Sequence, residues 1–115
     1  MQTSVVLLAR ELLEVGSGGF KELLVHQFRE DNTDQDDALQ EGVRRNFLTN
    51  FDTVMAELTA DFGEPTRSGI DDGRGDVPLC GIFRFAVWAT GKGDLFLAAA
   101  HEDRECPYLL AVGTI

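Results

Sequence analysis

The fold is decided by residues 80–100, CGIFRFAVWATGKGDLFLAAA, in which two apolar runs flank a short polar turn. In the first run the side chains alternate and are apolar on much of both faces, which is typical of a central strand. The glycine-rich sequence at residues 90–94 suits a hairpin turn. A charged turn at residues 101–106 and Pro107 then introduce another apolar run. We therefore predict a three-stranded antiparallel β-meander over residues 80–90, 94–101 and 107–114.

The first half of the chain has helical spacing instead. Apolar residues recur every three or four positions over residues 4–15, and again through a much longer stretch further on. Gly63 and Pro65 end that long helix, since glycine adopts the left-handed conformation of a helix end and proline cannot continue a helix. Residues 20–30 show the same spacing after a glycine-rich break, although residues 24–28 also alternate as a strand would. We predict helices over residues 4–15, 20–30 and 37–62.

Together these segments predict a single α+β domain covering residues 1–115, with the helices packed on the meander. A sheet of three strands cannot bury its apolar face alone, so the helical stripes must cover one face of it. Between the long helix and the meander, residues 64–78 are rich in glycine, proline and charge. We expect this segment to be a long surface loop.

Charge is the most informative feature of the composition. The chain has 20 acidic and 10 basic residues, which is a formal net charge of −10. Nucleic-acid backbones and anionic membrane surfaces require a basic face, so the charge argues against direct binding to either. An acidic domain is suited to steering a basic protein partner onto itself, although the same charge also serves solubility alone. A signal-peptide pattern and a run of membrane-spanning length are both absent and only two cysteines occur, so we expect a cytoplasmic protein.

No pattern in the sequence predicts catalysis. Residues 101–106, HEDREC, hold the densest group of reactive side chains, but their spacing matches no zinc motif and a charged turn explains them. The acidic segment 71–76, DDGRGD, lacks the ligand spacing of a calcium loop. Cys80 and Cys106 fall at one end of the predicted sheet with a strand between them, so we expect two reduced thiols. The expectation is a protein that is not an enzyme and has no catalytic residue, cofactor or metal site.

The order of elements after residue 50 resembles that of a known group of proteins. A helix ending in LTADFGEP at residues 58–65 precedes a strand that carries Trp88. Then follow LFLAAA at 95–100, a charged turn, and PYLLAVG at 107–113. Over residues 50–115 this order resembles small bacterial immunity proteins that neutralise polymorphic or contact-dependent toxins. The resemblance implies a protein that covers the basic substrate cleft of a toxin and performs no chemistry of its own.

The carboxylates proposed for this contact lie between the predicted elements. They are Asp31, Asp34, Asp36, Asp37, Asp71, Asp72, Asp76, Glu102, Asp103 and Glu105. Two other classes of function remain as alternatives. One is a phage-type inhibitor or DNA mimic such as an anti-CRISPR, and the other is a chaperone-like or regulatory domain that dimerises through apolar surface. The expected state is therefore a monomer or a homodimer.

Overall fold

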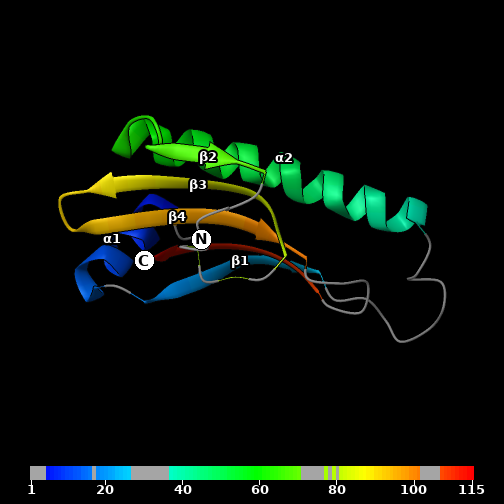
Figure 1. The fold of residues 1–115 in the computed structure, drawn as a ribbon, viewed down its shortest axis with the longest axis horizontal. Coiled ribbons are helices and arrows are strands. Elements are labelled where there is room, and N and C mark those ends of the chain that lie inside the picture. The colour runs from blue at the N-terminus through cyan, green and yellow to red at the C-terminus, as the bar shows by residue number, and fades with distance from the viewer. Residues whose placement is uncertain are drawn as a thin grey trace.

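A computed structural model describes residues 5–16, 18–26, 37–70, 77, 79, 81–101 and 107–115 of the chain. Within these residues lie two helices and five strands (Figure 1). In chain order they are α1 (Val5–Val15), β1 (Phe20–His26), α2 (Asp37–Phe62), β2 (Arg67–Gly69), β3 (Ile82–Thr90), β4 (Gly93–Ala100) and β5 (Tyr108–Thr114).

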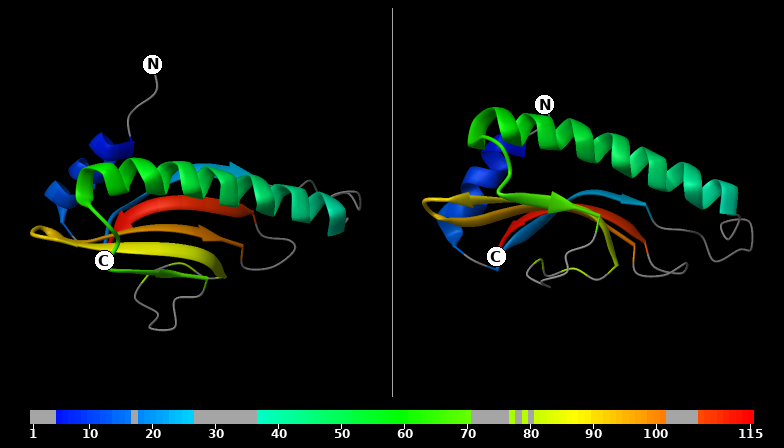
Figure 2. Two further views of the ribbon diagram at one scale, coloured as in Figure 1. Left: turned by 90° about the horizontal axis from the view of Figure 1, so that it is seen from above. Right: turned by 45° about the horizontal axis from the view of Figure 1, so that its top comes forward.

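The five strands form one sheet in the order β1-β5-β4-β3-β2, and every neighbouring pair is antiparallel. The long helix α2 runs lengthwise over one face of this sheet, while α1 packs near one end of it (Figures 1 and 2). The α+β class predicted from the sequence agrees with this arrangement. The predicted architecture, three helices on a three-stranded meander, is wrong because two further strands extend the sheet, one at each edge.

Residues 20–30, predicted as a helix, begin instead with the edge strand β1. Gly16 and Gly18 have φ values of 111° and 91°, which let the chain reverse after α1 and run beside β5. The register shifts between Glu22 and Leu24, and both Leu23 and Leu24 pack against the core. A β-bulge of this kind places two successive apolar residues on one face, which imitates helical spacing. The alternative of a strand, based on residues 24–28, was the correct one for the part of them that the structure describes.

The other additional strand, β2, lies inside the segment predicted as a surface loop over residues 64–78. Its three residues carry no apolar alternation, so pairing with β3 and not burial defines it. Thr66 starts this pairing, because its backbone N–H donates to the Val87 carbonyl at 2.7 Å and its hydroxyl accepts from the Ala89 N–H at 2.9 Å. The Arg67 guanidinium lies 5.2 Å from the centre of the Phe85 ring, a cation–π contact across the strand pair.

The three strands predicted from the deciding stretch and the C-terminus are present within one or two residues of their expected bounds. Their alternation has one interruption, a register shift between Ile82 and Arg84 of β3. At this bulge Phe83 faces the helices and joins the main core with Ala86 and Trp88. Arg84 also faces α2, because its guanidinium lies 5.8 Å from the centre of the Phe51 ring. The strand therefore contributes three apolar side chains and one arginine to the helical face, in a register that strict alternation does not predict.

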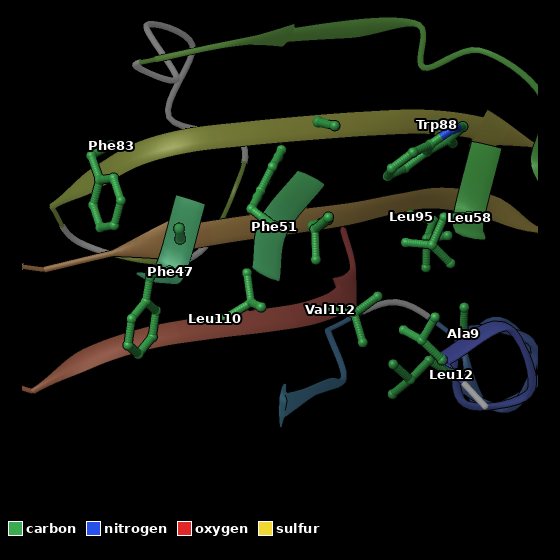
Figure 3. Packing of buried hydrophobic residues seen from close by; sticks show 14 of the residues in the cluster. Ala9, Leu12, Phe47, Phe51, Leu58, Phe83, Trp88, Leu95, Leu110 and Val112 are labelled. Atoms are coloured by element: carbon green, nitrogen blue, oxygen red, sulfur yellow. The ribbon is translucent and has the colours of Figure 1, made fainter. Parts of the chain in front are cut away.

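The core lies between the sheet and the helices (Figure 3). Phe47, Phe51 and Leu58 of α2 project onto the sheet, and each is at most 1% exposed. A second and smaller cluster covers the other face of the sheet, where Val77 packs against β3 and β4. Burial of these large apolar side chains is the main favourable contribution to folding. It makes the sheet a rigid support for the segments that leave its ends.

Candidate protein interface

Most of the carboxylates predicted to contact a partner lie outside the described residues. This holds for Asp31, Asp34, Asp36, Asp71, Asp72, Asp76, Glu102, Asp103 and Glu105, and also for the two cysteines. Asp37 is the first residue of α2, and its backbone alone is described. The structure nevertheless shows where the chain leaves and re-enters the sheet around each acidic segment.

Two of the three acidic segments connect to the sheet at the same end. Segment 27–36 follows His26, which pairs with Tyr108 at the start of β5. Segment 102–106 joins β4 to β5, whose residues Ala100 and Leu109 are partners at that end. Segment 71–76 instead follows β2, whose last residue Gly69 pairs with Phe85, and the chain returns at Val77 on the face opposite the helices. Antiparallel pairing thus brings the attachment points of two segments distant in sequence to one end of the sheet.

The three acidic segments account for most of the net charge. Segments 27–36, 71–76 and 102–106 together contain 10 of the 20 acidic residues and only 3 of the 10 basic residues. The rest of the chain, with 10 acidic and 7 basic residues, is close to balanced. Seven of these ten acidic residues belong to segments 27–36 and 102–106, which attach to the sheet at one end.

Several charged side chains in the described part of the chain form ion pairs with neighbours. Arg10 donates two hydrogen bonds to Asp61, at 2.6 and 3.2 Å, and so ties α1 to the end of α2. Lys92 in the β3–β4 hairpin pairs with Glu14. Each pair is solvent-exposed and contributes at most about 1 kcal/mol to stability. Together the two pairs hold α1 against the end of α2 and against the β3–β4 hairpin.

A groove lies between β1 and the N-terminal half of α2, next to the end of the sheet that carries the acidic segments. Its volume is about 380 Å³, and its walls are residues 24–26 of β1 and Gly42, Val43, Asn46 and Phe47 of α2. The lining is largely apolar, and the Val25 side chain is 44% exposed. Sequence patterns did not predict this groove, because residues 20–30 were assigned to a helix. The sequence feature that could have indicated the groove is Gly42, a glycine inside the predicted long helix.

His101, the most reactive residue of the predicted charged turn, packs against an aromatic cluster. Its ring stacks on Tyr108 with the centroids 3.8 Å apart and the planes 10° from parallel. Phe47 and Phe83 also contact the Tyr108 ring, at centroid distances of 5.5 and 5.8 Å. Among the residues that the structure describes, no three His, Cys, Asp or Glu side chains are grouped so as to hold a metal ion. These contacts give His101 a packing role at the acidic end of the sheet.

Tyr108 provides a test of this cluster at alkaline pH. Burial raises its pKa above the usual 10.0, while the charge of Arg44 acts in the opposite direction. The folded state thus holds the phenol proton more tightly than the unfolded chain does. This contribution to stability is fully present below pH 10 and is lost as the pH rises through the higher pKa of the folded state.

Because Tyr108 is the only tyrosine, the ultraviolet absorbance of tyrosinate reports on it alone. We expect a titration midpoint above 10.0 in the native protein and near 10.0 in denaturant. Tyr108→Phe should remove this part of the alkaline loss of stability. A native midpoint at or below that of the denatured chain would contradict the buried position of the ring.

Searches against protein-family models, curated proteins and solved structures return no match to this chain. In the described part of the chain, neither helix combines the length and apolar character needed to span a bilayer. The function must therefore be argued from the site itself, namely its charge, its groove and the rigidity of its support.

Proposed function

We propose that this chain is a binding inhibitor of the immunity-protein kind, which neutralises a basic bacterial toxin in the cytoplasm by covering the active site of the toxin. One observation supports the proposal above all. Two of the three acidic segments, 27–36 and 102–106, attach to the same end of a five-stranded sheet, so their carboxylates can face one partner together. A basic cleft built to bind a nucleic-acid backbone is the complement of such a surface.

In this proposal the charge controls the rate of association and the packed fold controls the rate of dissociation. The excess carboxylates attract the basic partner over a distance and orient it, which raises the rate of association. The sheet and α2 hold the attachment points in place, so little ordering is needed on binding and the complex dissociates slowly. Inhibition by occlusion requires no catalytic group and no metal in the inhibitor.

The proposal predicts that charge in the three segments controls the association rate. Three variants each remove three carboxylates, namely Asp31, Asp34 and Asp36→Asn, Asp71, Asp72 and Asp76→Asn, and Glu102→Gln with Asp103→Asn and Glu105→Gln. A control variant removes the same number of exposed charges from the helices and the turn after α2, with Glu11, Glu57 and Glu64→Gln. At low salt at least one segment variant should associate about tenfold more slowly, and the control should change less than about threefold.

The partner for this measurement is the purified toxic domain encoded next to the gene for this chain. Co-expression of this chain should also relieve growth arrest caused by that domain. If no neighbouring gene encodes a toxic protein, or if co-expression gives no relief, the proposal is wrong. If relief occurs but all three segment variants associate at the unmodified rate, occlusion stands and the role of the acidic segments is wrong.

A further inference from the structure

Strand β1 is an edge of the sheet with an unusual amount of exposed surface. It is seven residues long and five of those residues are exposed. Phe20 and Val25 are large apolar residues that remain 43% and 44% exposed. Among the described strands, β5 alone pairs with β1, so the outer side of β1 faces none of them. Natural proteins usually protect such an edge, because it can pair with another chain.

Gly42 lines the adjoining groove on the side of α2 and has no side chain that could fill it. Glycine inside a helix costs about 1 kcal/mol relative to alanine, so its presence calls for a reason. Gly42 does not have the positive φ that favours glycine, and a Cβ atom built on it would meet nothing within 4 Å. No contact in the described part of the chain therefore forces this position to be glycine. Its absence keeps the groove open.

An extended chain fits these two features better than a helix does. The groove runs between the exposed edge of β1 and α2, so a strand laid along β1 can form main-chain hydrogen bonds with it. Every second side chain of that strand then points toward the groove, where Val25, Val43 and Phe47 form an apolar lining. A volume of about 380 Å³ suits a few apolar side chains and not a whole helix.

Charge indicates which chain supplies the strand. The sequence that joins β1 to α2 carries four carboxylates, Glu30, Asp31, Asp34 and Asp36, against one arginine. Two copies of a chain with a net charge of −10 repel each other, so a second copy is disfavoured at this position. A strand from a basic protein has the complementary charge.

We propose that the edge of β1 and the neighbouring groove receive a β-strand of the basic partner, with alternating apolar and basic side chains. The apolar side chains enter the groove beside Gly42, and the basic ones complement the net charge of −10 of the chain. This inference deepens the proposed function and rests on it, because the strand belongs to the protein that is inhibited. It assigns the specificity of binding to the groove and the speed of binding to the acidic segments.

The test uses a synthetic peptide of about eight residues that alternates lysine and valine. Two control peptides have proline in place of alternate valines, or glutamate in place of every lysine. Amide NMR spectra of the full chain are recorded during titration with each peptide. With the lysine–valine peptide we expect shifts at residues 20–26 and 42–47 and slower hydrogen exchange along β1. Proline removes main-chain donors, and glutamate reverses the charge, so each control peptide should bind at least about tenfold more weakly.

Each groove variant has a control that carries the same new side chain away from the groove. Val25→Thr replaces an apolar contact with a polar one of similar shape, and Val15→Thr makes the same change at a residue that is 83% exposed on α1. Gly42→Phe fills the groove, and Ala56→Phe adds the same ring on the exposed side of α2. We expect roughly fivefold weaker peptide binding for Val25→Thr and a loss of tenfold or more for Gly42→Phe. The two controls should bind as the unmodified chain does.

The outcomes separate this inference from the proposed function. Equal binding of the lysine–valine and proline peptides, or no effect of Val25→Thr and Gly42→Phe, overturns the docking of a strand and leaves inhibition through the acidic segments intact. Equal binding of the lysine and glutamate peptides overturns the role of charge and leaves the strand site intact. Light scattering that shows a stable dimer abolished by Gly42→Phe would assign the groove to a second copy of this chain and overturn the inference.

Discussion

Replacing Gly113 with alanine should destabilise the protein by about 3 kcal/mol or detach β1 from the sheet. A Cβ atom at this position would lie 2.5 Å from the Phe20 Cβ and 2.6 Å from both the Gly19 carbonyl oxygen and the Phe96 Cε2. The Gly19 oxygen is main chain, and it already accepts a hydrogen bond from the Thr114 N–H at 2.8 Å. The strand pair therefore cannot yield without losing that bond.

Urea unfolding monitored by circular dichroism measures this effect. Gly42→Ala is the matched control, because it is the same substitution in open space within a helix. It should stabilise the protein by about 0.5–1 kcal/mol. A Gly113→Ala variant as stable as the unmodified chain would show that β1 does not pair with β5 in the register described.

Replacing Trp88 with alanine should cost about 3–5 kcal/mol, which is a large part of the stability of a domain of this size. Trp88 is 1% exposed and lies in the core next to Leu58 and Leu95 (Figure 3). Its indole N–H also donates to the Gly63 carbonyl at 2.8 Å, directly after the end of α2. The side chain thus fills the core and holds the end of α2 against β3.

The conservative variant Trp88→Phe separates these two roles. It keeps most of the apolar volume and removes the hydrogen bond to the Gly63 carbonyl, so we expect a loss of about 1–2 kcal/mol. Thermal unfolding followed by circular dichroism compares the three proteins, because the variants lack the only tryptophan fluorophore. Similar losses for Trp88→Phe and Trp88→Ala would assign the contribution to the hydrogen bond and contradict the dominant role of packing.

The elements of the fold differ in how far local sequence specifies them. The long helix was predicted correctly over residues 37–62, because its apolar spacing and its stop at Gly63 are local signals. Residues 20–26 failed because a bulge in an edge strand produces the same spacing as a helix turn. Residues 67–69 failed because a strand of three residues is defined by its partner β3, which the local sequence does not reveal.

The candidate site was likewise only partly predictable from the sequence. The acidic segments were visible in the sequence as charge between elements, but the attachment of two of them to one end of the sheet depends on which strands are neighbours. The groove requires both β1 and α2, so it had no counterpart in any continuous stretch of sequence. The sequence shows Gly42 as a glycine in a long helix, but only the structure shows that it borders open space.

The sequence by itself determined the α+β class, the acidic charge, the long helix and the three C-terminal strands. These properties follow from composition and from the period of apolar residues along the chain, both of which are local. The tertiary structure alone decided that β1 and β2 extend the sheet, that two of the acidic segments share one end and that a groove borders the exposed edge. Each of these depends on pairing between residues far apart in the chain, and such pairing is selected by burial and hydrogen bonding of the whole domain.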